Sequence, residues 1–151
     1  MTENNQMEVI FDARSENEGF ARVVIAAFLA QKNPTMDELA DVKTAVSEAV
    51  TNSIIHGYEA VRGKVRMTCT LSGDCVEICV EDKGRGIADI ARAMQPFYTT
   101  KPQEERSGMG FAFMEAFMDE VRVESKPQVG TTVFMKKILG SPKEEDVCQT
   151  I

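Results

Sequence analysis

A glutamate and an asparagine lie four residues apart in a segment whose apolar residues recur at helical spacing. Glu48 and Asn52 are therefore expected on one face of a helix, beside its buried stripe. A carboxylate can accept the proton of an attacking hydroxyl, and an amide oxygen can bind Mg²⁺ among phosphates. Ordinary polar helix surface often has the same spacing, so the pair alone leaves both interpretations open.

A second candidate is Asp82, which ends a predicted strand on the same side as the core-facing Ile78 and Val80. A buried carboxylate needs a hydrogen-bond donor, and the amino group of adenine is one such donor. Gly84 and Gly86 would let the backbone approach a base closely. The alternative is a turn aspartate followed by turn glycines, and the local sequence taken alone favours this alternative.

A third candidate is the sequence SGMGF at residues 107–111, which leads into apolar residues at helical spacing. Free N–H groups and the helix dipole at such a start suit a phosphate, and Lys101 and Arg106 could meet phosphate oxygens. The sequence is neither a P-loop nor a dinucleotide fingerprint. A glycine-loosened helix start and ordinary surface cations would have the same residues. Gly130 with Thr131, at a strand start, is by itself only a turn.

The elements that must position these residues follow from hydrophobic periodicity. Period-two alternation predicts strands at 7–13, 64–71, 76–80, 120–125 and 131–137. Helical spacing predicts helices after residues 15, 35 and 110. The order of these elements predicts an α+β two-layer sandwich, with the helices on one face of a mixed, mainly antiparallel sheet.

Two of the helices begin with a capping-box pattern, Ser15 with Glu18 and Thr35 with Glu38. The first helix should end near residues 32–34, and the second should end at Gly57. The first helix is marked by the apolar residues Phe20, Val23, Val24, Ala27 and Phe28. The second is marked by Leu39, Val42, Val46, Ala49, Val50 and Ile54.

Composition limits the function classes. The chain has 151 residues and a net charge of −7, which argues against nucleic-acid binding because phosphate contacts need clustered Lys and Arg. One domain is predicted over residues 1–139, with a disordered tail at 140–151. The first residues do not resemble a signal peptide and no apolar run could span a membrane, so a cytoplasmic location is expected. The four cysteines form no C-x-x-C pair and indicate no metal site.

The order and spacing of the motifs over residues 35–137 resemble the ATP-binding (Bergerat) fold shared by gyrase, a heat-shock chaperone, histidine kinases and mismatch-repair proteins. This resemblance implies that Asn52 binds Mg²⁺, that Asp82 takes the adenine amino group and that Thr131 lies near adenine. The nucleotide-binding residues it implies are Asn52, Asp82, Gly84, Gly86, Ile87, Thr99, Lys101, Arg106, Ser107, Gly108, Met109, Gly110, Phe111 and Thr131.

Four longer stretches of sequence point to one subgroup of this family. SEAVTN at 47–52, IHGY at 55–58, FYTTKP at 97–102 and RSGMGF at 106–111 closely resemble the sporulation anti-sigma-F factors of endospore-forming bacteria. The resemblance implies a homodimer that holds sigma-F when ATP is bound, phosphorylates a serine of an anti-anti-sigma protein, and is left with ADP. Glu48 would orient or deprotonate that serine. Arg14 and Arg22 could meet acidic groups on sigma, although a solvated basic edge is an equal alternative.

Two other functions stay open at this point. One is an ATP-gated sigma-binding clamp without significant kinase activity, although such a clamp would need no base at Glu48. The other is a related serine kinase and anti-sigma factor of the general-stress pathway. A histidine kinase would need an acceptor histidine on a dimerising helix pair, and the sole histidine, His56, is expected to cap or pack at a helix end.

Overall fold

Five strands form one antiparallel sheet in the computed structural model, which describes residues 4–57, 63–87, 89–90, 94 and 110–140. The strand order is β1-β2-β3-β5-β4, and all four neighbouring pairs are antiparallel. The strands are β1 (Asn5–Asp12), β2 (Lys64–Ser72), β3 (Cys75–Asp82), β4 (Glu120–Lys126) and β5 (Gly130–Ile138). They match the strands that the sequence predicts.

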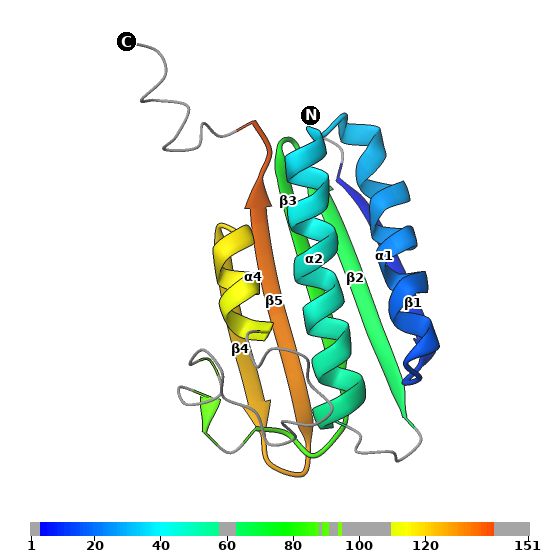
Figure 1. The fold of residues 1–151 in the computed structure, drawn as a ribbon, viewed down its shortest axis with the longest axis vertical. Coiled ribbons are helices and arrows are strands. Elements are labelled where there is room, and N and C mark those ends of the chain that lie inside the picture. The colour runs from blue at the N-terminus through cyan, green and yellow to red at the C-terminus, as the bar shows by residue number, and fades with distance from the viewer. Residues whose placement is uncertain (1–3, 58–62, 88, 91–93, 95–109, 141–151) are drawn as a thin grey trace.

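Three helices lie in a single layer over one face of this sheet, with α2 between α1 and α4 (Figure 1). The helices are α1 (Glu16–Leu29), α2 (Met36–Asn52) and α4 (Gly110–Phe117), and shorter turns follow α1 at Ala30–Lys32 and α2 at Ser53–Gly57. The predicted α+β two-layer sandwich is confirmed. Within the described residues, no helix is both long and apolar enough to cross a membrane.

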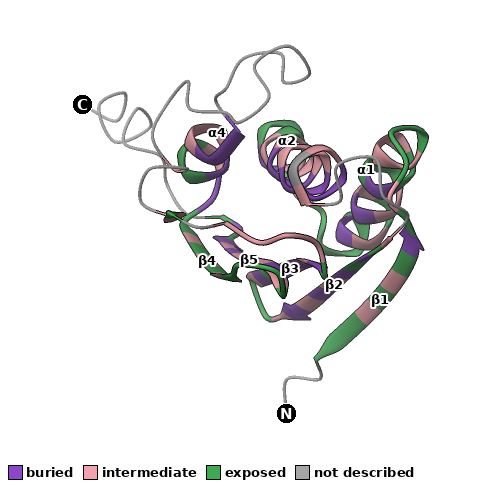
Figure 2. Cartoon of the chain, turned by 90° about the horizontal axis from the view of Figure 1, so that it is seen from below, coloured by how far each residue is buried: buried purple, intermediate pink, exposed green. Residues whose placement is uncertain are grey.

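The core lies between the two layers. Buried positions on the helices face the sheet, and the opposite face of the sheet is mostly exposed or half-buried (Figure 2). Alternate residues of the central strands point into this core, as period-two alternation predicts. These residues are Val65, Met67, Cys69 and Leu71 of β2 and Val76, Ile78 and Val80 of β3.

The buried face of α1 differs from the predicted stripe. Ala21, Ile25 and Leu29 are fully buried, whereas Phe20 is 49% exposed and Val23 is 67% exposed. Apolar residues extend around most of this helix, so periodicity identifies the helix but does not select the face that packs. The consequence is an exposed apolar surface on α1.

The predicted capping box of α2 is present. The N–H of Glu38 donates to the Thr35 hydroxyl at 3.1 Å, and the N–H of Thr35 donates to the Glu38 carboxylate at 2.9 Å. A second carboxylate oxygen of Glu38 accepts from the N–H of Gly140 at 2.7 Å, so the start of α2 is also tied to the residues that follow β5.

The predicted capping box of α1 is wrong. Ser15 has helical backbone angles, and its side chain makes no capping hydrogen bond. The Glu18 carboxylate accepts instead from the hydroxyl of Ser47 on α2 and pairs with Arg22 at 3.1 Å. The alternative partners of Glu18 explain the failure, because a long-range hydrogen bond and an ion pair compete with the local cap.

A buried lysine joins three elements at the end of the molecule where α4 finishes. The Lys137 ammonium, on β5, donates to the carbonyl of Phe117 at 2.7 Å and lies 3.5 Å from the carboxylate of Asp41 on α2. Phe117 is the last residue of α4. A cation at a helix C-terminus binds carbonyls that have no partner within the helix, so Lys137 anchors this end of α4.

Candidate functional site

The first residue of α4 lies against the predicted catalytic face of α2. A Cβ atom added to Gly110 would lie 3.0 Å from the amide nitrogen and 3.3 Å from the amide oxygen of Asn52, and 3.3 Å from a carboxylate oxygen of Glu48. The fold therefore joins two motifs that are about sixty residues apart in sequence. The absence of a side chain at Gly110 allows the start of α4 to approach both polar groups.

Asp82, at the end of β3, is buried and accepts several hydrogen bonds. The N–H of Gly84 donates to it at 3.0 Å, and the side chain of Ser53 and the backbone of Thr131 also donate. Burial nevertheless dominates and raises the pKa of Asp82 above its ordinary value. The protein thus supplies donors to this carboxylate but not enough to offset desolvation, so a further donor from a ligand would stabilise its charged form.

The glycines after Asp82 permit close backbone contacts. A Cβ atom on Gly84 would lie 2.0 Å from the carbonyl oxygen of Gly57, which accepts from the N–H of Arg85 at 2.8 Å. Gly86 has a φ of +75°, and a Cβ atom there would lie 2.1 Å from the carbonyl oxygen of Lys126. These contacts join protein segments to one another, and the approach of Gly84 and Gly86 to a base stays a prediction.

Hydroxyl groups connect the loop after β3 to the β4–β5 hairpin. The Ser125 hydroxyl accepts from the N–H of Ile87 at 2.7 Å, donates to the carbonyl of Gly130 at 3.0 Å and lies 2.8 Å from the Thr131 hydroxyl. Thr131 is buried and is paired with Asp82 across β3 and β5. Ser125 was missed by sequence reasoning, although a polar residue at a core-facing position of β4 is a usable signal.

The remaining predicted nucleotide residues divide into two groups. Phe111 is buried in the hydrophobic core one residue after Gly110. The others lie outside the described residues, so their predicted roles stay predictions: Thr99, Lys101, Arg106, Ser107, Gly108 and Met109.

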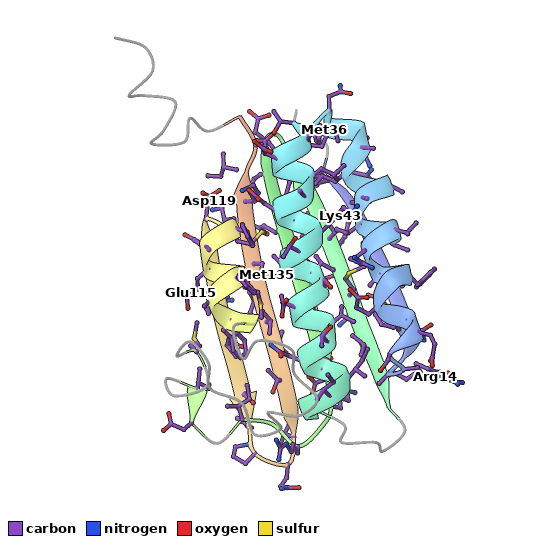
Figure 3. All side chains as sticks on the ribbon, in the orientation of Figure 1. Arg14, Met36, Lys43, Glu115, Asp119 and Met135 are labelled. Carbon is purple, nitrogen blue, oxygen red and sulfur yellow. The ribbon has the colours of Figure 1, made fainter. Side chains whose placement is uncertain are left out.

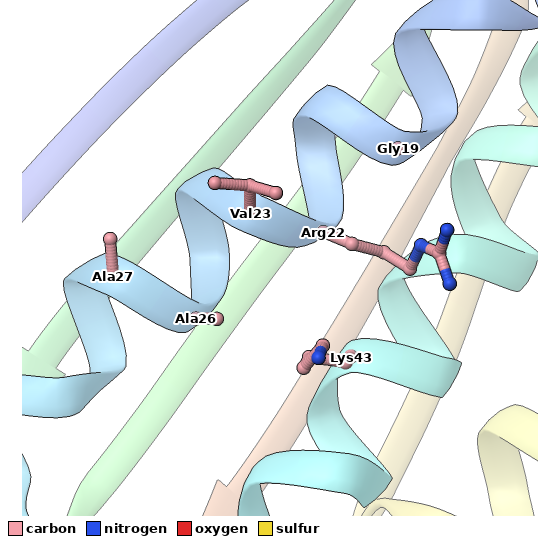
Figure 4. A pocket seen from close by; sticks show the side chains of 6 residues that line it. All are labelled: Gly19, Arg22, Val23, Ala26, Ala27 and Lys43. Carbon is pink, nitrogen blue, oxygen red and sulfur yellow. The ribbon is translucent and has the colours of Figure 1, made fainter.

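The predicted partner-binding arginines lie on or next to α1, as expected. Arg14 is 70% exposed at the start of the helix (Figure 3) and lies 3.3 Å from Glu16. Arg22 is half-exposed and extends from α1 toward α2 (Figure 4). Arg22, Lys43 and the exposed Val23 line a shallow pocket between these helices. Two arginines, each paired with a glutamate, therefore lie beside exposed apolar surface of α1.

Comparisons with known proteins agree with this geometry. A family model described as a histidine kinase-like ATPase domain matches residues 11–137. Among solved structures, the RsbU and RsbW domains of a Mycobacterium tuberculosis protein superimpose with a TM-score of 0.67 and 25% identity, over 91% of this chain and 33% of that one. The catalytic domain of the histidine kinase ThkA gives a TM-score of 0.53 at 17% identity, over 91% of this chain and 99% of the other, and shows the fold alone.

Curated relatives are considerably more similar in sequence. An anti-sigma F factor of Halalkalibacterium halodurans is 54% identical over 92% of this chain and 96% of its own length. The anti-sigma F factor of a Thermoanaerobacter species is 55% identical over 95% of this chain and 100% of its own length. That of Bacillus subtilis is 54% identical over 92% of this chain and 96% of its own length. The chain therefore belongs to the anti-sigma F factor family, and its nucleotide-binding domain is of the histidine kinase-like ATPase type.

Proposed function

We propose that this protein binds and inhibits a sporulation sigma factor in an ATP-dependent manner and phosphorylates a serine of its anti-anti-sigma protein. The observation that carries the proposal is the meeting of Glu48 and Asn52 at Gly110, because this contact gathers a carboxylate, an amide and a helix start at one point. The identity of 54% to 55% with anti-sigma F factors supports the choice of partner.

The phosphate end of the site would be formed by α2 and the start of α4. The amide oxygen of Asn52 is a hard ligand of the kind that Mg²⁺ prefers, and it lies beside a helix N-terminus, whose N–H groups favour phosphate oxygens. When bound, Mg²⁺ would neutralise the negative charge on the phosphates. Lys101 and Arg106 and the backbone of residues 107–110 are proposed to meet the remaining phosphate oxygens.

Phosphoryl transfer depends on positioning and charge neutralisation more than on covalent help. The serine hydroxyl oxygen would form a bond to the γ-phosphorus while the bond from that phosphorus to the bridging oxygen of ADP breaks. Glu48 would accept the hydroxyl proton as this bond forms. Because the Glu48 and Asn52 side chains both contact the Gly110 position, the proton acceptor and the phosphate site would be adjacent.

The adenine end of the site would lie over the ends of β3 and β5. Asp82 would accept a hydrogen bond from the adenine amino group, which supplies the additional donor that its burial favours. Thr131 lies beside Asp82 and would contact the same edge of the base. Gly84, Gly86 and Ile87 form the loop that follows, and Thr99 is proposed to belong to the phosphate side.

Partner binding would use a different surface. Arg14 and Arg22 are proposed to meet acidic groups on the sigma factor, and the exposed apolar residues of α1 lie next to them. We propose that the working unit is a cytoplasmic homodimer, and that ADP left after transfer favours a complex with the anti-anti-sigma protein.

A transfer assay tests the enzymatic part of the proposal. Purified protein, γ-labelled ATP, Mg²⁺ and the anti-anti-sigma protein should give label on a serine of the partner. Glu48→Gln should abolish labelling while ADP affinity by calorimetry stays unchanged. Glu115→Gln is the matched control, because Glu115 is exposed on α4 and should transfer normally.

The alternative outcome identifies the clamp. If the wild-type protein binds sigma only with ATP but never labels the anti-anti-sigma protein, the kinase assignment and the role of Glu48 are wrong. Full labelling by the Glu48→Gln variant would support the kinase assignment but would show that Glu48 is not the proton acceptor.

A further inference from the structure

One row of polar side chains crosses the sheet below the end of α2. Ser125 of β4 is paired with Thr131 of β5, and Thr131 is paired with Asp82 of β3. Directly paired residues of an antiparallel sheet project from the same face. Asp82 and Thr131 are buried with the core, so the row faces the helix layer. The hydroxyl of Ser125 therefore lies on the side of the sheet where the base is proposed to bind.

The Ser125 hydroxyl has three polar contacts and a single proton. The carbonyl oxygen of Gly130, 3.0 Å away, can only accept, so this contact is a hydrogen bond only when Ser125 donates its single proton to it. The N–H of Ile87 donates to the same hydroxyl at 2.7 Å. All three contacts are hydrogen bonds at the same time only when the Thr131 hydroxyl donates to Ser125 across 2.8 Å. The distance itself allows either hydroxyl to be the donor, and we take the arrangement that satisfies every contact.

The consequence concerns Thr131. In this arrangement its hydroxyl proton is given to Ser125, so its oxygen presents lone pairs and no proton to a ligand. Asp82, the neighbouring side chain in the row, is an acceptor when charged. Two acceptors side by side favour a ligand edge that donates, and they disfavour an edge that carries a carbonyl oxygen at the same position.

We propose that Ser125 is a positioning residue for base selection: it holds Thr131 as a hydrogen-bond acceptor and so favours a purine with a 6-amino group over one with a 6-oxo group. This inference rests on the proposed nucleotide site and deepens it. Without the Ser125 hydroxyl, Thr131 could rotate and donate to a 6-oxo group, so discrimination would fall although Thr131 itself is unchanged.

The test compares ADP with inosine diphosphate, in which an oxo group replaces the amino group. Dissociation constants for both are measured by calorimetry, and the readout is their ratio. The wild-type protein should prefer ADP, and Ser125→Ala should reduce the ratio about 5-fold, the value expected for one neutral hydrogen bond. Ser125→Thr keeps a hydroxyl and should restore the wild-type ratio. A general loss of stability would weaken both ligands and leave the ratio unchanged.

A double variant shows whether Ser125 acts through Thr131. Thr131→Val should also lower the ratio, and adding Ser125→Ala to it should change the ratio no further. An unchanged ratio in folded Ser125→Ala, or an equal further loss in the Thr131→Val background, would overturn the proposal.

Folding failure does not remove the test. If Ser125→Ala does not fold, Thr131→Val can still overturn the proposal, because a wild-type ratio in that variant would mean that Thr131 makes no selective contact with the base. Ser125→Thr then tests the position itself, and a ratio that differs from wild type in that folded variant would also overturn the proposal. Wild-type protein that binds neither diphosphate would reject the nucleotide site and this inference together, whereas tight ADP binding with unaltered selectivity in the variants would reject only the role of Ser125.

Discussion

Gly110, the first residue of α4, lies so close to Asn52 on α2 that an added Cβ atom would be 3.0 Å from the amide nitrogen. Gly110→Ala must therefore push α4 or the Asn52 side chain away by a few tenths of an ångström. We expect about 1 kcal/mol of lost stability and about a 10-fold loss of ADP affinity, measured by urea unfolding and calorimetry. Gly19→Ala in α1 is the control, because its Cβ would meet only an arginine tip at 4.0 Å. If Gly110→Ala leaves the ADP affinity unchanged, Asn52 does not contribute to nucleotide binding.

Asp82→Asn should weaken nucleotide binding. The variant replaces a charged acceptor by a neutral amide, and hydrogen bonds to charged groups are worth about 1.5–3 kcal/mol, so we expect a loss of about 10- to 100-fold in ADP affinity by calorimetry. The fold should persist, because the amide has nearly the same shape and keeps one oxygen that can accept from the donors of Gly84, Ser53 and Thr131. Unchanged affinity would exclude Asp82 from the adenine contact.

The same carboxyl makes stability depend on pH. Burial raises the pKa of Asp82, so the folded state binds its proton more readily than the unfolded state does. The cost of burying the charge is present at neutral pH and disappears as pH falls through the raised pKa toward the ordinary aspartate range. Without nucleotide, the wild-type protein should therefore gain stability relative to Asp82→Asn between pH 7 and pH 4, measured by urea unfolding. A difference that is independent of pH would contradict this.

Lys137→Met should destabilise the fold by about 3 kcal/mol, because it leaves the Asp41 carboxylate without its buried cation and the Phe117 carbonyl without a donor. Asp41→Asn combined with Lys137→Met should recover part of the loss. Lys136→Met is the control, since Lys136 is on the opposite face of β5. Urea unfolding measures all four proteins, and equal stability of the two lysine variants would show that the anchor contributes little.

Arg22→Glu should weaken sigma binding by at least about 10-fold, because it reverses a half-exposed charge and places it beside Glu18. ADP affinity should be retained, since Arg22 is away from Asp82. Arg122→Glu, on exposed β4, provides a charge-matched control. The affinity of each variant for the sigma factor is measured by calorimetry with ATP present. Wild-type affinity in the Arg22→Glu variant would show that Arg22 does not contribute to the interface.

The strands and α2 were predictable because each carries one clear period. Val65, Met67 and Cys69 alternate in β2, and the Thr35 box gives the start of α2. The buried face of α1 was not predictable, because Phe20 and Val23 fit a helical stripe as well as Ala21 does. Which face packs depends on α2 and the sheet, and periodicity within one helix contains no information about either.

The candidate site was predictable as a set of motifs but not as a geometry. The spacing of Glu48 and Asn52 indicated one helix face, and only the fold shows that Gly110 meets them. Glu18 was expected to cap α1 but accepts from Ser47, which is distant in sequence. Ser125 was missed, because one of its partners is the backbone N–H of the distant Ile87. The partners themselves leave no local pattern, and the one local signal is the polar Ser125 at a core-facing position of β4.

Lys137 of β5 fixes only one end of α4, so the helix could tilt about that end. Lys137 holds the Phe117 carbonyl, whereas the other end of the helix, Gly110, lies at the proposed phosphate site. The helix has eight residues, so its two ends are about 11 Å apart at the helical rise. With one end fixed, a tilt of about 10° would move Gly110 by about 2 Å, and a small rotation would then be enough to open or close its contact with Asn52.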